Sequence, residues 1–335
     1  MLLAPTFIVL AVIAFYPFAR VILSSFTNAR FASSGETSYV GLANYRQLLS
    51  LTIRELPLRL DDAGQPVVVN GRPQHQTWID VLPRQPLRYR AVFEFNLLGK
   101  RYVLGAVSSG FVRAIWDTAV FSIVAVSLET ILGMIIALVL VSNFPGRGVM
   151  RAAMLVPWAV ITAVSARIWE WMLQPTRAGL FNAVGSYLGI SDGRTDFFGS
   201  STLQLPSMIM MDVWKTTPFM ALLLLAGLST IPSELYEAAE IDGASRIKQF
   251  FRITLPLLTP TLAVALIFRT LDSLRVFDIF QVVLGSRRYS MASYAQDVLI
   301  NQRDFGLSSA ASVVIFALVA VFAVLYVRGM RVDTQ

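Results

Sequence analysis

Apolar residues along this chain gather into long runs that polar residues seldom interrupt. A helix needs about 20 apolar residues to cross the hydrocarbon core of a bilayer. Six stretches reach that length, at about Leu3–Phe26, Phe111–Val141, Met150–Leu173, Leu205–Leu228, Leu255–Gln281 and Phe305–Val327. Lipid offers no partners to backbone N–H and C=O groups, so we predict that each run is a helix. The short alternating segments typical of a membrane β-barrel are not found in the sequence.

The polar stretch after the first run has a different pattern. "LDDAGQPVVVNGRPQ" places an apolar run between two turn-forming clusters, and "RAVFEFNLLGKRYVLGAV" places two apolar runs around a glycine-bearing turn. Both patterns are typical of β-hairpins. We therefore predict a small β-containing insert outside the membrane at about Ser50–Gly110, with a disordered loop as the alternative. The predicted division is a first membrane helix at 1–27, an extracytoplasmic loop at 28–112 and a membrane core at 113–330.

The composition agrees with a membrane protein. Hydrophobic residues make up 55% of the 335 residues and charged residues only 15%, whereas a soluble domain has about 25% charged residues. The net charge of +7 comes from basic residues that lie mostly at the ends of apolar runs and in loops. That placement indicates membrane topology rather than a nucleic-acid partner. The chain has no cysteine and a single histidine, His75, so we predict neither a disulfide nor a metal site.

Basic residues between the runs predict an orientation. With the N-terminus inside, the cytoplasmic segments hold seven basic residues and the short outer loops hold five. Positive charge is enriched on the cytoplasmic side of membrane proteins. We therefore predict that both termini are cytoplasmic and that the first apolar run is an uncleaved span.

The connection between the fourth and fifth runs is unusually charged. It reads "ELYEAAEIDGASRIKQFFRITLP", from Glu234 to Pro256. Ser233 is a candidate helix N-cap, and Glu234 lies in the first turn, where the helix dipole favours an acid. Gly243 interrupts the helical pattern, so we predict two short helices joined by a glycine bend at the cytoplasmic surface. From composition alone, an amphipathic connector lying on lipid headgroups fits equally well.

The spacing within this connection decides between the two interpretations. The motif begins with "EAA" at Glu237, Ala238 and Ala239. Three residues then precede Gly243, and nine more precede "I-x-LP", which supplies Ile253, Leu255 and Pro256. This connection, at about 232–256, resembles the EAA loop of ABC-importer permeases. "GLANYRQLL", "FPGRGVMRAAMLVPWAV" and "FRTLDSLRVFDIF" resemble the maltose-permease-like, carbohydrate-importing branch of that family.

The resemblance implies an all-α membrane protein of type I ABC importer architecture in a bacterial or archaeal cytoplasmic membrane. The implied partners are a second homologous permease, two ATPase subunits, an extracytoplasmic solute-binding protein and a sugar, such as maltose or trehalose. Glu237 would contact the ATPase through its charge, Ala238 and Ala239 would form a close-packed face, and Gly243 would form the bend. The sequence has no "GxxxxGK[ST]", so the ATPase would bind ATP and Mg²⁺, and this chain would bind no cofactor and catalyse no reaction.

Two positions depart from the family pattern. Asp117 stands before Thr118, where the family often has Asn. "LGSRR", at Leu284–Arg288, stands where the family often has Thr-Gly-Gly-Gly-Pro. We therefore expect the outer loop that faces the binding protein to differ in detail from the family.

Polar and aromatic residues within the runs are candidates for a substrate pathway, because such residues usually face a bundle interior or a water-filled cavity. Arg269, Asp272, Ser273 and Val276 have the spacing of one helical face. An internal Arg–Asp pair that locks the spans is the alternative for this face, and an interface anchor is the alternative for Trp158. The family's sugar-contacting segments nominate Trp158, Thr162, Lys215, Thr216, Phe219, Arg269, Ser273 and Val276.

Other functions fit parts of the sequence. An ion-coupled secondary transporter could use Arg269, Asp272 or Asp278 as a relay, but it would not need the EAA segment, and the sequence shows no inverted repeat. A membrane-embedded enzyme would need a nucleophile, metal or cysteine motif that the sequence lacks. An ABC importer for a glycerol phosphate stays open as an alternative to a sugar importer.

Overall fold

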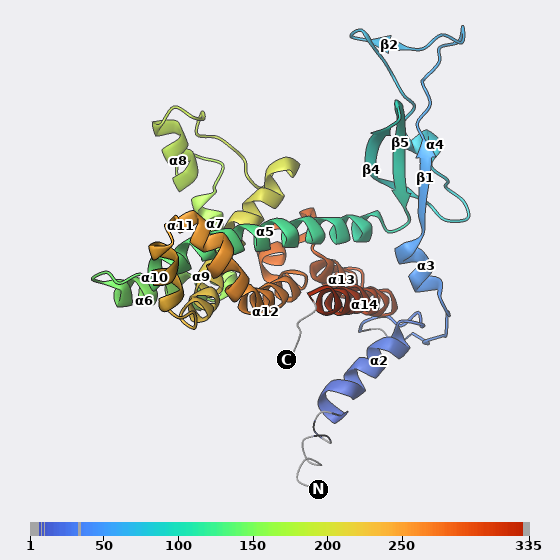
Figure 1. The fold of residues 1–335 in the computed structure, drawn as a ribbon. Coiled ribbons are helices and arrows are strands. Elements are labelled where there is room, and N and C mark those ends of the chain that lie inside the picture. The colour runs from blue at the N-terminus through green and yellow to red at the C-terminus, as the bar shows by residue number, and fades with distance from the viewer. Residues whose placement is uncertain (1–6, 8, 10, 33–34, 331–335) are drawn as a thin grey trace. The chain divides into compact units, whose positions relative to one another are not determined.

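The structure is a computed structural model that describes residues 7, 9, 11–32 and 35–330. Helices make up most of it, and the strands are confined to one short part of the chain (Figure 1). The predicted fold class, a helical membrane protein with a small strand-containing insert, is confirmed.

The chain forms two compact units, and both are discontinuous in sequence. One unit contains residues 1–116 and 291–317, and the other contains residues 117–290 and 318–335. Two long helices, α5 (Ser109–Val141) and α14 (Phe305–Met330), contribute to both units. The linear division into a first membrane helix, an extracytoplasmic loop and a membrane core stays a prediction.

Four helical runs of the described chain are long and apolar enough to cross a membrane. They are α5, α9 (Ser201–Leu228), the run Arg246–Ser273 and α14. A bent pair of helices adds a fifth candidate, and a shorter apolar helix covers Ala11–Ser24. This shorter helix consists of a π-helical turn, η1 (Ala11–Phe15), and α2 (Tyr16–Ser24). The predicted first span begins at residue 3, and residues 3–6, 8 and 10 lie outside the described part of the chain.

The predicted third span, Met150–Leu173, is not one continuous helix. It divides into α6 (Arg147–Ala159) and α7 (Thr162–Met172), which are bent by 92°. The break lies at Val160 and Ile161, which have extended backbone angles with ψ of 134°. Pro157 lies inside α6, and the helix ends two residues beyond the proline rather than at it.

The predicted fifth span, Leu255–Gln281, is shorter at its C-terminal end than the sequence suggests. Its helix α12 (Leu255–Ser273) ends where polar residues interrupt the apolar run, and the chain turns before η3 (Phe280–Leu284) and η4 (Gly285–Arg287). At its other end, α12 continues from α11 (Arg246–Gln249) through the π-helical turn η2 (Phe250–Thr254).

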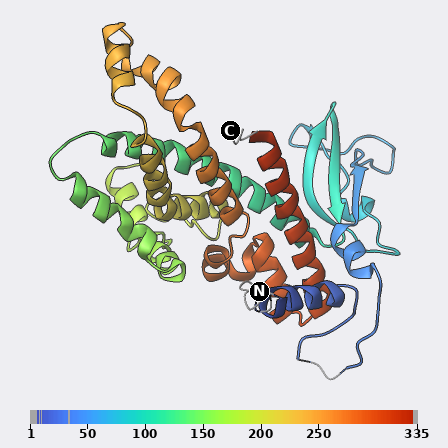
Figure 2. The same ribbon diagram turned by 60° about the horizontal axis from the view of Figure 1, so that its bottom comes forward.

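This continuity changes the picture of the charged connection. The first of its two predicted short helices is α10 (Glu234–Ile241), but the second is the beginning of the long α11–α12 run. Gly243 lies between them with φ of +73°, a conformation that glycine adopts readily. Ser233 makes no side-chain capping bond to α10, whereas Ser245 caps α11. Figure 2 shows this segment, coloured gold to orange, as a helical hairpin at one end of its unit.

Within residues 117–290, α5 and α9 pack closely, as do α9 and α12. A Cβ atom on Gly133 of α5 would lie 2.8 Å from Met220 Cγ and 3.1 Å from the backbone nitrogen of Ala221. A Cβ atom on Gly227 of α9 would lie 2.7 Å from side-chain atoms of α12. Glycine at both contacts therefore lets the helices approach closely enough to bring their polar side chains together. The remaining helix of this unit is α8 (Leu180–Tyr187).

The insert contains a three-stranded antiparallel sheet in the order β1-β5-β4, formed by β1 (Leu51–Glu55), β4 (Arg90–Leu97) and β5 (Lys100–Ala106). A second ribbon pairs β2 (Val68–Val69) with β3 (Arg72–Pro73). Both hairpins turn at two residues with positive φ, as the predicted turns require, and these residues are Asn70, Gly71, Leu98 and Gly99.

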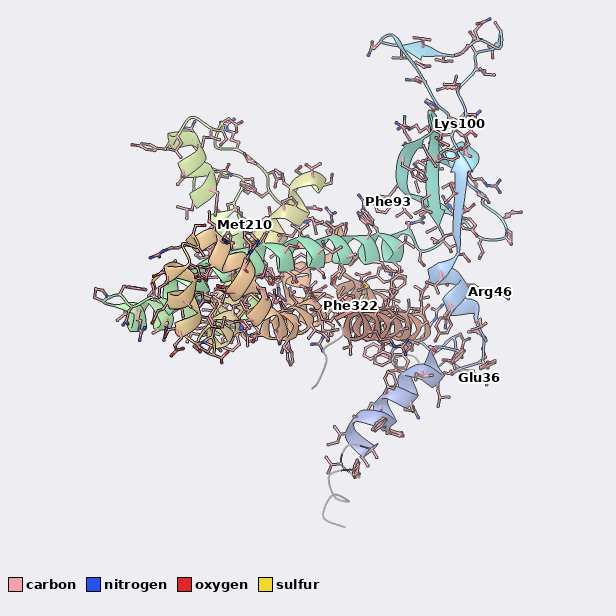
Figure 3. All side chains as sticks on the ribbon, in the orientation of Figure 1. Glu36, Arg46, Phe93, Lys100, Met210 and Phe322 are labelled. Atoms are coloured by element: carbon pink, nitrogen blue, oxygen red, sulfur yellow. The ribbon has the colours of Figure 1, made fainter. Side chains whose placement is uncertain are left out.

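The sheet has a small apolar core of its own. Leu56, Leu82 and Val103 are buried there. Phe93 of β4, which is labelled in Figure 3, also packs edge-on against Trp116 of α5, with ring centroids 5.7 Å apart. Lys100 of β5 forms an exposed ion pair with Glu55 of β1 at 2.9 Å. The other helices of this unit are α3 (Ala43–Leu49), α4 (Trp78–Val81) and α13 (Met291–Ile300).

Candidate functional site

A polar cavity lies between α7, α9 and the end of α12. Its volume is about 170 Å³. Seven of the nine residues predicted for the substrate pathway line it, and these are Thr162, Lys215, Thr216, Arg269, Asp272, Ser273 and Val276. The helical-face spacing on α12 therefore identifies residues that the fold brings together with residues from two other helices.

The remaining two predicted residues lie elsewhere. Trp158 of α6 and Phe219 of α9 stack on each other, with ring centroids 5.6 Å apart and planes 9° apart. Neither lines the cavity. Because each ring covers a face of the other, the described arrangement does not offer that face to a sugar.

Arg269 is the centre of a buried charge cluster beside the cavity. Its Nε and Nη2 donate to Glu129 of α5 at 2.5 and 2.9 Å. Its Nη2 also donates to Asp212 of α9, and its Nη1 donates to Asp272 of α12 at 3.1 Å. The Arg269 side chain is 3% exposed and that of Glu129 is 0% exposed. An ion pair so completely removed from water needs this dense hydrogen bonding to offset the loss of hydration.

The position of Arg269 agrees with both predictions made for its helical face, a substrate pathway and an internal Arg–Asp pair. Arg269 lines the cavity, as a pathway residue would, and it also forms the internal Arg–Asp pair that locks spans together. Its strongest contacts join α12 to α5 and α9, which are distant in sequence. Arg269 therefore has a structural role, whatever it offers to a substrate.

Lys215 holds the break between α6 and α7. Its Nζ donates to the backbone oxygen of Val160 at 2.5 Å and to that of Trp158 at 3.3 Å. The carbonyls at the end of a helix have no partner within the helix, and its C-terminus attracts a positive charge. The ammonium group of α9 thus satisfies the end of α6 while lining the cavity.

Two members of the cluster were not predicted as site residues. Glu129 lies within the apolar run of α5, and Asp212 lies within α9. The available signal was the cost of an ionisable residue in an apolar membrane helix, which usually marks a buried partner or a cavity. Sequence reasoning applied that rule to α9 and α12, where it left Asp212 out of the predicted pathway, and missed it at Glu129.

The two departures from the family pattern contact each other. Arg288, in the segment after η4, donates through Nε and Nη2 to both carboxylate oxygens of Asp117 at 2.7 and 2.6 Å. Its Nη1 donates to the backbone oxygen of Ser201, the first residue of α9, at 2.7 Å. The side chains of Asp117 and Arg288 are 2% and 13% exposed. This bidentate pair holds the segment after η3 to α5 and α9.

The predicted ATPase-coupling residues lie on an open surface. Glu237, Ala238 and Gly243 are exposed, and Ala239 is partly exposed. Within the described chain, Glu237 forms no ion pair. Beneath α10, the side chain of Tyr236 bonds to Thr254 of η2 at 2.9 Å, which ties the helix to the start of the fifth span.

Comparison with known families matches residues 103–331 to the family described as the binding-protein-dependent transport system inner membrane component. The chain belongs to this family. It is therefore a non-catalytic membrane component of a binding-protein-dependent transport system, as the EAA spacing indicated.

Curated relatives of this transport component span most of its length. The trehalose/maltose transport system permease protein MalF of Thermococcus litoralis is 49% identical over 242 residues, which cover 71% of this chain and 81% of that protein. The sulfoquinovosyl glycerol transport system permease protein SmoG of Agrobacterium fabrum is 30% identical, and the match covers 99% of this chain and 89% of that protein. The trehalose transport system permease protein SugA of Mycobacterium tuberculosis is 37% identical, and the match covers 63% of this chain and 67% of that protein.

Solved structures of transport components show the same fold. A chain of a bacterial ABC transporter involved in the import of the acidic polysaccharide alginate matches with a TM-score of 0.69. The match has 18% identity and covers 100% of this chain and 95% of that one. A chain of a bacterial alginate ABC transporter in complex with an alginate pentasaccharide-bound periplasmic protein matches with a TM-score of 0.62, 24% identity and coverage of 68% and 81%.

Proposed function

We propose that this chain is a permease subunit of an ATP-driven importer that moves a neutral saccharide, such as trehalose or maltose, into the cytoplasm by alternating access. The observation that carries the proposal is the exposed EAA segment on a chain of the binding-protein-dependent family. The names of two relatives, a trehalose/maltose permease and a trehalose permease, support the substrate class.

The arrangement of α10 supports the role of a docking element for an ATPase. Its Glu237 carboxylate is exposed and Ala238 is small, so a partner surface can approach closely and supply an opposite charge. In the proposed complex, two ATPase subunits bind ATP and Mg²⁺, and this chain binds neither. The segment 232–256 and both chain termini then lie on the cytoplasmic side, and the β-containing insert lies outside.

The charges around the cavity favour a neutral substrate over a glycerol phosphate. The lining contains three acidic residues (Asp212, Asp272 and Asp278) and three basic residues (Lys215, Arg269 and Arg275), so its formal charge is zero. Arg269 and Lys215 already bind carboxylates and backbone carbonyls. A phosphate dianion needs an excess of free cationic donors, whereas sugar hydroxyls are satisfied by mixed donors and acceptors.

The size of the cavity supports a second permease. Sites for small molecules usually have volumes of about 300 Å³ or more, and this cavity has about 170 Å³. We propose that a homologous permease supplies the opposite wall and that an extracytoplasmic solute-binding protein delivers the saccharide. The ion-coupled alternative is less well supported, because it does not account for the exposed EAA segment.

Glu237→Lys in the reconstituted complex tests the proposal. Charge reversal on the docking helix should abolish binding-protein-stimulated ATP hydrolysis and uptake of radiolabelled trehalose or maltose, or should release the ATPase from the membrane subunits. Asp62→Lys makes the same change of charge on an exposed loop of the insert and should leave both activities intact. Normal coupling in Glu237→Lys would show that this segment is not the docking element.

A further inference from the structure

Glu129 belongs to the charge cluster but lies outside the cavity. It is fully buried in α5 and does not line the cavity, so a substrate there cannot touch it. Its carboxylate instead contacts two residues that do line the cavity. Oε1 accepts from Thr216 Oγ1 at 2.6 Å and from Arg269 Nη2 at 2.9 Å, and Oε2 accepts from Arg269 Nε at 2.5 Å.

These contacts determine what Arg269 and Thr216 can still offer. A guanidinium group has five N–H donors, and the cluster uses four of those on Arg269. Nε donates to Glu129, and Nη2 donates to Glu129 and to Asp212. Nη1 donates one hydrogen to Asp272. The Thr216 hydroxyl has one hydrogen to donate, and its Oγ1 lies 2.6 Å from both Glu129 Oε1 and the Asp212 backbone oxygen. Thr216 is thus left with its lone pairs, and Arg269 with one N–H.

The other two carboxylates of the cluster do not have this double contact. Asp212 lines the cavity and pairs with Arg269 on one side. Asp272 is 67% exposed and lies one turn from Arg269 on the same helix, so its pair is weakened by water. Glu129 binds one residue of α9 and one residue of α12 through a single buried carboxylate.

We propose that Glu129 is a positioning residue for the substrate cavity. Its negative charge holds Arg269 in one orientation and turns Thr216 into a hydrogen-bond acceptor, so that the cavity presents one donor and one acceptor to a sugar hydroxyl. This role rests on the proposed function for its substrate, but the arrangement of Arg269 and Thr216 is testable without any substrate.

The absence of cysteine from the chain provides the test. In the full transport complex, Val276→Cys places a thiol in the cavity lining. The ratio of its labelling rates by a cationic and a neutral methanethiosulfonate reagent reports the charge near that thiol. Adding Glu129→Gln, which keeps the size and removes the charge, should lower this ratio about tenfold, the effect of one unit charge at about 10 Å in a partly polar medium. Adding Glu129→Asp, which keeps the charge, should leave the ratio near that of Val276→Cys alone.

Uptake by the single variants then separates positioning from packing. Glu129→Gln and Thr216→Val should each reduce uptake about tenfold or more, and the double variant should lose no more than the worse single variant, because both act through one contact. Radiolabelled trehalose, maltose and glycerol 3-phosphate serve as probes. Uptake of glycerol 3-phosphate alone would contradict the proposed function and leave the positioning role to be judged with that probe.

Three outcomes would overturn the positioning role. One is an unchanged labelling ratio in the variant with Glu129→Gln. Another is additive losses in the double variant. The third applies if Glu129→Gln does not assemble with its partners, and it is a Thr216→Val variant that assembles and transports like the wild type, because the contact through which Glu129 is proposed to act would then not matter for transport.

Discussion

A buried ion pair stabilises a fold only while both of its charges are present. Asp117 and Arg288 form such a pair, and Arg288 also holds the first carbonyl of α9. Removing one member leaves a desolvated charge without a partner, whereas removing both leaves a neutral contact. The two positions that depart from the family pattern are therefore coupled through one buried contact.

Single and double variants test this pair. Asp117→Asn or Arg288→Met should each lower the free energy of unfolding by about 3 kcal/mol, and the double variant should lower it by less than the sum of the two. Thermal unfolding of the purified complex in detergent measures the effect. Arg287→Met, at the exposed neighbouring residue, is the matched control and should change little. Additive losses in the double variant would contradict the coupling.

Residue by residue, the sequence predicts the cavity better than it predicts the cluster beside it. Spacing on α12 and the segments of α7 and α9 identify seven lining residues. Glu129 is not predicted from the sequence, because its partners Thr216 and Arg269 lie 87 and 140 residues away along the chain. Only the packing of three helices brings these side chains together, and no local pattern records that packing.

At the scale of the elements, close helix contacts depend on glycine. Gly133 of α5 faces Met220 and the backbone of Ala221 on α9, one turn beyond the contact between Glu129 and Thr216. A methyl group there has no room unless the helices separate. The position of the cluster therefore depends on a residue that has no polar group of its own.

Gly133→Ala should lower the free energy of unfolding by about 1–3 kcal/mol, the usual cost of overpacking, and should reduce uptake by shifting Glu129 away from Thr216. Gly148→Ala is the matched control, because a Cβ atom at Gly148 of α6 meets no atom within 4 Å. That change should be neutral or slightly stabilising, since alanine favours the helix. Thermal unfolding and uptake of the two variants would be compared, and equal behaviour would contradict the close contact.

Element boundaries are predicted well where local chemistry sets them. Asn-Gly and a second glycine-bearing turn identify both hairpins of the insert. The break between α6 and α7 is missed, because apolar residues continue through Val160 and Ile161 and the partner for the freed carbonyls is Lys215, on another helix. A hydropathy pattern depends only on local sequence, so it cannot show that the Lys215 ammonium group stabilises a helix break at Val160.

At the scale of the whole molecule, the insert and the membrane helices carry separate apolar cores. The ribbon of β2 and β3 adds exposed apolar residues rather than core, with Val68 58% exposed and Val69 46% exposed. Leu56, Leu82 and Val103, which form the core of the three-stranded sheet, lie outside the ribbon. We therefore expect the ribbon to be dispensable for folding.

Replacing residues 60–73 with a short glycine–serine turn should leave complex assembly and the free energy of unfolding within about 0.5 kcal/mol of the wild type, as for other surface changes. Leu82→Ala, which removes a buried side chain of the sheet, should cost about 2 kcal/mol or more. Circular dichroism melts and size-exclusion chromatography measure both. A large loss of stability without the ribbon would show that it packs against another part of the complex.

The uninterrupted run from α11 through η2 to α12 has a mechanical consequence. At 1.5 Å per residue, about 35 Å of helix separates Arg246, beside the Gly243 bend, from Arg269 in the charge cluster. Over that length, a rotation of about 5° at one end displaces the other by about 3 Å, which is the length of a hydrogen bond. A tilt of α10 that the whole run followed would therefore be large enough at its far end to exchange one set of partners of Arg269 for another.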